Sequence, residues 1–135
     1  MKNFLVIFCL FFIATVKAEE IMQISIKSGD LEVICQLNQS GAAKDLIKQL
    51  PLKVKVENYS SNEKVFNPKQ KLSTANTPLA NGKIYSFAYF APWNNLVLFY
   101  KKGSPFSGLF ELGQCVQNVE NISKFSGEIE LSLKN

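Results

Sequence analysis

GKIYSFAYFAPWNNLVLFYKKGSPFSGLFELG, residues 82–113, holds the only tryptophan of the chain and most of its tyrosines. Two strand patterns lie within it. Ile84–Tyr89 alternates aromatic residues with smaller ones, and Asn95–Tyr100 carries an apolar run of the kind found in strands that are buried on both sides. Leu109–Leu112 continues as a third strand. The segment therefore predicts the centre of a β-sheet.

The residues before this segment predict a hairpin, a helix and a further strand. Residues 22–27 and 31–37 alternate apolar and polar side chains on either side of a turn sequence, which is the pattern of a β-hairpin. Ser40 can cap a helix whose apolar residues recur at the spacing of one helical face, and Pro51 ends it. Residues 52–57 then return to strand alternation, with lysines on the wet face.

The rest of the chain adds short elements. Residues 59–81 form a long polar excursion with one or two short strands, residues 118–125 a short helix, and residues 128–133 a final strand. Many short strands without repeated strand-helix alternation favour closure over a parallel sheet. The predicted fold class is therefore mainly β: a closed barrel of about eight strands with two short helices.

The first 18 residues have the pattern of a secretory signal peptide. Lys2 precedes the apolar run Phe4–Val16, and small or tolerated residues lead to a cleavage position at Ala18. A membrane anchor is the alternative, but the run falls short of the roughly 20 residues that a spanning helix needs. We therefore expect a secreted or periplasmic protein whose mature part, residues 19–135, is one domain without a stable membrane anchor, and which is a monomer.

Composition excludes several chemistries. Every basic residue is lysine, and the chain contains no histidine. Without His there is no Ser-His-Asp or Cys-His pair and no imidazole metal site, and without Arg there is no planar clamp for carboxylate or phosphate. Loss of Lys2 and Lys17 with the signal peptide lowers the formal charge from +4 to +2, which is too small for a nucleic-acid surface. We expect no metal, no cofactor and no nucleic-acid partner.

Two cysteines remain after cleavage, Cys35 and Cys115. An oxidising compartment permits them to form a disulfide. In the alternative reading each is a small apolar core residue, and Cys35 is in phase with the apolar face of its strand. Both readings stay open on the sequence.

Three features together resemble the small bacterial cyclophilin-like domain proteins: Gly82-Lys83-Ile84-Tyr85, the Asn-Leu-Val-Leu-Phe-Tyr strand at residues 95–100, and Leu112-Gly113. The order of elements over nearly the whole mature chain agrees. The resemblance implies a closed barrel of about eight strands with a helix at each end. It offers no catalytic residues, because the small members of this group are functionally uncharacterised, and this chain lacks the arginine and histidine that the active face of true cyclophilins uses.

An aromatic and amide cluster is the positive clue to function. Phe90, Trp93 and Asn94 follow Tyr89 in the loop between two central strands, and Tyr59 and Phe106 belong to other loops. Apolar walls with a few amides suit a small ligand or an extended peptide at the barrel mouth. In the alternative, the aromatic residues plug the barrel and the asparagines make a tight turn.

Two functional hypotheses follow. The first is a non-catalytic binding module for a small molecule or peptide, whose binding residues are Tyr59, Tyr89, Phe90, Trp93, Asn94 and Phe106. The second is a divergent peptidyl-prolyl isomerase, in which Lys83 or Lys102 would lie beside an aromatic floor. Lysine would serve there only as a point charge, without the fork of an arginine.

Overall fold

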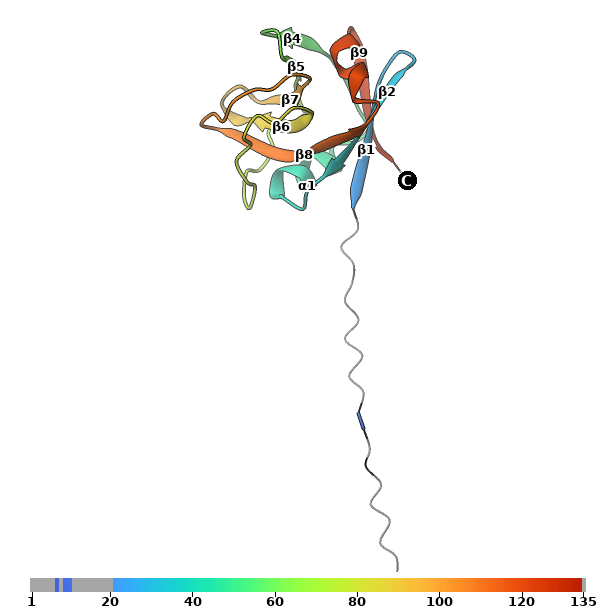
Figure 1. Ribbon diagram of the computed structural model, residues 1–135, viewed down its shortest axis with the longest axis vertical. Coiled ribbons are helices and arrows are strands. Elements are labelled where there is room, and N and C mark those ends of the chain that lie inside the picture. The colour runs from blue at the N-terminus through green and yellow to red at the C-terminus, as the bar shows by residue number, and fades with distance from the viewer. Residues whose placement is uncertain (1–6, 8, 11–20, 135) are drawn as a thin grey trace, which may run out of the picture.

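The computed structural model describes residues 7, 9, 10 and 21–134, so nearly all of the predicted signal peptide lies outside the described residues. Within residues 21–134, nine strands and three short helices follow one another (Figure 1). They are β1 (Met22–Ser28), β2 (Leu31–Leu37), α1 (Gly41–Lys48), β3 (Leu52–Lys55), β4 (Glu57–Tyr59), β5 (Glu63–Phe66), β6 (Ser86–Phe90), η1 (Ala91–Trp93), β7 (Asn95–Phe99), β8 (Leu109–Gln117), η2 (Val119–Lys124) and β9 (Glu128–Lys134). The short helices η1 and η2 are 3-10 helices.

The strands form one antiparallel sheet that curls into a nearly closed barrel, in the order β3-β9-β1-β2-β8-β6-β7-β5-β4. Its two edges, β3 and β4, are consecutive in the chain and meet at Val56. The N–H of Val56 donates to the carbonyl of Gly127 at 2.9 Å. The predicted single strand over residues 52–57 is therefore two strands, because the chain must leave its partner β9 and turn toward β5. This split raises the strand count from about eight to nine.

One continuous core fills the barrel. Its largest fully buried members include Tyr89, Phe66, Phe87 and Phe125. α1 lies at one end of the barrel and η2 at the other (Figure 1), and both contribute buried side chains to this core. The predicted barrel with a helix at each end is thus confirmed, as an interior packed with side chains.

Local chemistry explains the first helix. The Ser40 hydroxyl accepts a hydrogen bond of 3.2 Å from the N–H of Ala43, which satisfies a donor that the first helical turn leaves free. Ala42, Ala43 and Leu46 form the buried face of α1. The predicted cap and apolar face are therefore confirmed, and the predicted helix near residue 120 is present as η2.

Cys35 of β2 and Cys115 of β8 lie directly opposite each other and form a disulfide, with their α-carbons 3.7 Å apart. Both are also buried in the core, so the two readings of these cysteines hold together. Two residues along β8, Gly113 faces Gln36 so closely that any β-carbon on Gly113 would collide with the Gln36 backbone. The contact between β2 and β8 thus requires glycine here.

Lys64 points into the interior although it belongs to the short exposed hairpin of β4 and β5. Its ammonium group donates to Oδ1 of Asn58 and, at 2.9 Å, to the carbonyl of Phe125. It lies 5.9 Å from the centre of the Tyr100 ring. Desolvation lowers the pKa of Lys64. These contacts join the hairpin to the end of η2 and leave the lysine a structural role.

Candidate functional site

The outer face of the sheet carries a second apolar cluster over β5, β6 and β7. Along β7, Leu96 and Leu98 enter the interior core, whereas Val97 and Phe99 belong to the outer cluster together with Ala88 of β6. This division follows from the alternation of side chains along a strand. β7 is therefore apolar on both faces, as its sequence predicts.

Two loops cover part of this outer face. The N–H of Gly103 donates to the carbonyl of Gly82 at 2.7 Å and holds the loop after β7 against the loop before β6. Gly103 also lies against the Phe99 ring, with no room for a β-carbon. Phe99 is consequently only 2% exposed. The remaining part of the face stays open.

The turn between β6 and β7 presents Trp93 beside the open part. Pro92 is in the first turn of the 3-10 helix η1, and Asn94 ends it with a left-handed backbone, φ 53°. The Asn94 N–H donates to the carbonyl of Ala91 at 3.1 Å, and Asn67 donates through Nδ2 to the Asn94 carbonyl at 2.7 Å. Two hydrogen bonds to the Asn94 backbone, one from a side chain and one within the turn, thus fix the position from which the indole projects.

Four aromatic rings form one connected wall. The Trp93 and Phe90 ring centres are 5.2 Å apart, those of Trp93 and Tyr59 5.6 Å, and those of Phe90 and Phe106 5.6 Å, all in edge-to-face geometry. This is a preferred arrangement of aromatic pairs. Yet Tyr59, Trp93 and Phe106 remain 46%, 57% and 66% exposed. The wall is ordered by its own contacts and still faces solvent.

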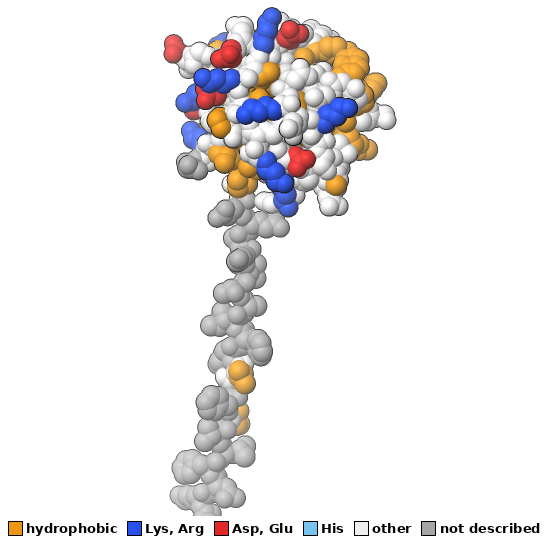
Figure 2. Space-filling model, turned by 180° about the vertical axis from the view of Figure 1, so that it is seen from behind, with side chains coloured by type: hydrophobic (Ala, Val, Ile, Leu, Met, Phe, Trp, Pro, Cys, Tyr) orange, Lys and Arg blue, Asp and Glu red, His pale blue; other side chains and the backbone are white. Residues whose placement is uncertain are grey.

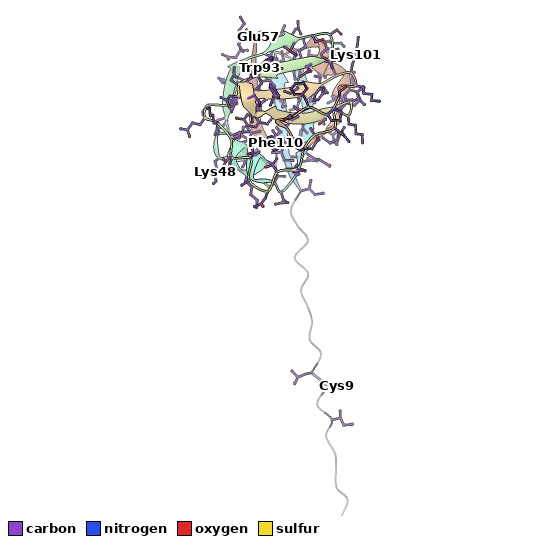
Figure 3. All side chains as sticks on the ribbon, turned by 90° about the vertical axis from the view of Figure 1, so that its left-hand side faces the viewer. Cys9, Lys48, Glu57, Trp93, Lys101 and Phe110 are labelled. Atoms are coloured by element: carbon purple, nitrogen blue, oxygen red, sulfur yellow. A yellow bond between two sulfur atoms is a disulfide. The ribbon has the colours of Figure 1, made fainter. Side chains whose placement is uncertain are left out.

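The wall and the outer cluster enclose a groove of about 470 Å³. Figure 2 shows hydrophobic side chains gathered along one margin of the barrel, which corresponds to the side of β5–β7 in Figure 1. In Figure 3 that side faces the viewer, and Trp93 lies toward the same end as Glu57 and Lys101. The groove is lined by Tyr59, Ser60, Asn62, Glu63, Val65, Phe90, Trp93, Asn95, Val97, Phe99, Lys102, Gly103, Ser104, Phe106 and Leu109.

A carboxylate lies among these apolar groups. Glu63 pairs across the sheet with Tyr59 of β4 on one side and with Phe99 of β7 on the other. Burial raises its pKa above the ordinary value of 4.5, because desolvation disfavours the charged form. Within residues 21–134, its side chain has no ion-pair partner within 4.0 Å.

Two further polar residues line the groove. Oδ1 of Asn62, next to Glu63, is shielded from solvent and has no hydrogen-bond partner in the described part of the chain. Lys102 belongs to the loop after β7 and is exposed. The groove therefore has an accessible acceptor at Glu63, a shielded and unpartnered one at Asn62, and one exposed cation on a loop.

Comparison with known proteins bears on the fold. The sequence model of the cyclophilin-like family matches residues 26–134. The chain belongs to the cyclophilin-like family. Its fold is also similar to that of a hypothetical protein from Archaeoglobus fulgidus known by its solution structure, with a TM-score of 0.64 and 15% identity over 88% of this chain and 99% of that one. No curated protein matches the sequence.

Within this cyclophilin-like barrel, four of the six predicted binding residues come together: Tyr59, Phe90, Trp93 and Phe106 all line the groove. Tyr89 and Asn94 do not. Tyr89 is 1% exposed and belongs to the interior core, because it alternates with Ala88 and Phe90 along β6. Asn94 instead binds the Tyr89 hydroxyl.

The groove lies on the outer face of the sheet, whereas the sequence analysis placed it at the barrel mouth. The difference arises at Phe90, whose side chain faces outward and draws Trp93 and Phe106 to that side through ring contacts. Of the two lysines considered for an isomerase site, Lys102 lines the groove and Lys83 is absent from its lining.

Sequence reasoning missed Asn62 and Glu63. They lie in a polar stretch, and only the pairing of β5 with β7 brings them beside the aromatic wall. The alternation in Glu63-Lys64-Val65-Phe66 was the available signal, since it places Glu63 and Val65 on one face.

Other surfaces offer less chemistry. A shallow hollow of about 340 Å³ is lined by lysines, glutamines and Asp45 near the end of α1. Among the described residues there is no group of three His, Cys, Asp or Glu side chains that could hold a metal ion. In the same residues, no helix has the length and hydrophobicity needed to cross a lipid bilayer.

Proposed function

We propose that this chain is an exported, non-catalytic binding module of the cyclophilin-like family, and that its outer-face groove takes a small molecule with an apolar body. The observation that carries the proposal is the exposed aromatic wall. Three large aromatic side chains remain about half exposed or more, although each is held by a ring contact to a neighbour. Large apolar groups in this state are typical of ligand sites.

The size of the groove favours a small molecule over an extended peptide. Its volume of about 470 Å³ is within the range of roughly 300–1,000 Å³ that small-molecule sites occupy. The loop at Gly103 and Ser104 contributes to its lining. Export follows from the sequence pattern of residues 1–18.

Native mass spectrometry of the protein recovered from its own host tests this proposal. We expect a retained small-molecule mass on the wild type and on Leu79→Ala, and its loss from Trp93→Ala. Leu79 is the matched control because it is 67% exposed and absent from the groove lining. Retention of the mass by Trp93→Ala would contradict the groove as the site. The same spectrum reports whether the chain begins after Ala18.

Prolyl isomerisation is the alternative function, and one observation favours it. Lys102 lines the groove together with the ring of Phe99 and the aromatic wall, which is the arrangement expected for a lysine-assisted site. A prolyl-turnover assay on wild type and Lys102→Ala decides between the two. Catalysis that Lys102→Ala abolishes would replace the binding-module proposal.

A further inference from the structure

The groove carries a charge that no partner balances. The Glu63 carboxylate is partly desolvated and forms no ion pair in the described residues. A carboxylate taken out of water costs free energy unless an opposite charge or hydrogen bonds compensate it. Next to it, Oδ1 of Asn62 lacks a hydrogen-bond donor. One end of the groove is thus short of positive charge.

Aromatic groups adjoin this end. Glu63 of β5 lies opposite Tyr59 of the neighbouring strand β4. The Tyr59 ring contacts the Trp93 ring, with 5.6 Å between their centres. Aromatic faces attract cations through their quadrupoles, with tryptophan the strongest. The Glu63 carboxylate and the neighbouring rings of Tyr59 and Trp93 therefore all attract a cation.

We infer that the ligand of this groove is a small organic amine, bound with its cationic nitrogen at Glu63 and its apolar body against Trp93 and Phe90. The inference rests on the proposed function and names the ligand class of the same groove. Lys102 also lines the groove, but it is exposed, belongs to the loop after β7 and forms no ion pair with Glu63 within 4.0 Å.

The alternative classes fit the groove less well. A neutral ligand can offer the Glu63 carboxylate a hydrogen bond but no opposite charge, and an anion would meet that charge directly. A cation supplies both a hydrogen bond and an opposite charge, and so compensates the desolvated carboxylate most fully.

Three probes that share one apolar body test the inference: 2-phenylethylamine, 2-phenylethanol and 3-phenylpropionate. Trp93 is the only tryptophan, so its fluorescence reports binding at the groove directly. Because the amine adds a positive charge opposite the carboxylate whereas the alcohol offers only a neutral hydroxyl, we expect the amine to bind about tenfold tighter than the alcohol, a difference of about 1.4 kcal/mol. The carboxylate should bind most weakly.

Variants separate the inference from the proposed function. Glu63→Gln keeps the shape of the side chain and removes its charge. The affinity for the alcohol should stay the same, and the affinity for the amine should fall to that of the alcohol. Glu57→Gln is the matched control, since Glu57 belongs to the same hairpin, is exposed and does not line the groove. It should preserve the tenfold preference.

Other results would contradict the cation inference. Equal binding of amine and alcohol by the wild type, or a preference that survives Glu63→Gln, would overturn the cation inference and leave the groove as a binding site. Tightest binding of 3-phenylpropionate would also overturn it and assign recognition to Lys102. If none of the three probes binds, the inference falls together with the proposed small-molecule site.

Discussion

The Tyr89 hydroxyl donates a hydrogen bond of 2.7 Å to Oδ1 of Asn94, the residue that ends the turn holding Trp93. It also accepts one of 3.3 Å from the backbone N–H of Leu72. A side chain rooted in the interior core thus positions two surface segments. Its contribution to the groove is indirect.

Removal of this hydroxyl should weaken both the fold and the groove. We expect Tyr89→Phe to lower the free energy of unfolding by about 1–2 kcal/mol, because the buried Leu72 N–H loses its acceptor. Urea denaturation measures the loss. Tyr59→Phe is the control, since no hydrogen bond is formed by the Tyr59 hydroxyl within residues 21–134. Equal stability of the two variants would contradict the structural role of Tyr89.

The glycine at the β2–β8 contact gives a second prediction. Gly113→Ala should lower the free energy of unfolding by about 3 kcal/mol, because the new methyl group collides with the Gln36 carbonyl and forces the strands apart. Gly29→Ala has open space around it and a φ of 57°, so only the left-handed backbone penalty of about 1 kcal/mol applies. The comparison fails if the two variants unfold at the same urea concentration.

The disulfide gives a third prediction. Cys35 and Cys115 are 80 residues apart in sequence, and closing so long a loop restricts the unfolded chain. We expect the double variant Cys35→Ala, Cys115→Ala to be less stable by about 4 kcal/mol in the chain-entropy model. Reducing agent should destabilise the wild type and leave the double variant unchanged. An equal response of both proteins would show that these thiols are not paired in solution.

Acid stability should depend on Glu32. A 2.7 Å hydrogen bond from Ser25, followed by the charges of Lys134 and Lys27, lowers its pKa below 4.5. A carboxyl of this kind stabilises the fold above its unfolded-state pKa, and the contribution disappears as pH falls through the folded-state pKa. Unfolding free energy measured below pH 4.5 should therefore decrease less steeply for Glu32→Gln than for the wild type or for Glu128→Gln.

Glu63 should behave in the opposite way. Burial raises its pKa above 4.5, so its stabilising contribution exists at low pH and is lost as pH rises through the folded-state pKa. Glu63→Gln should consequently unfold at a higher urea concentration than the wild type at pH 7, with the difference vanishing at acid pH. A less stable variant at pH 7 would mean that Glu63 has a compensating partner.

Local patterns predicted most of the strands, the cap of α1 and the barrel. They worked because alternation and helical spacing report which face of an element is buried. The break at Val56 escaped them, since Leu52–Glu57 alternates without interruption and only the change of partner from β9 to β5 divides it. β8 is likewise longer than its pattern indicated.

The sequence pointed to four of the residues that line the groove, but it placed them at the barrel mouth instead of on the outer face of the sheet. Trp93 and Phe90 were predicted as loop aromatic residues that either bind a ligand or plug the barrel, but the side of the sheet on which they gather depends on which way Phe90 faces. Local alternation places Glu63 on the same face as Val65, but it does not reveal the neighbours Tyr59 and Phe99, which come from two other strands. Such contacts depend on how strands that are far apart in the sequence pair, and local patterns do not report this pairing.

The sheet order divides the strands into two blocks, β3-β9-β1-β2 and β8-β6-β7-β5-β4. Strands β3, β9, β1 and β2 come from the two ends of the described chain, and the groove is lined only by residues between 59 and 109. The Cys35–Cys115 bond joins the blocks at their boundary. Substitutions confined to residues 59–109 can therefore change the groove while the disulfide and the strands β1, β2, β3 and β9 keep their sequence.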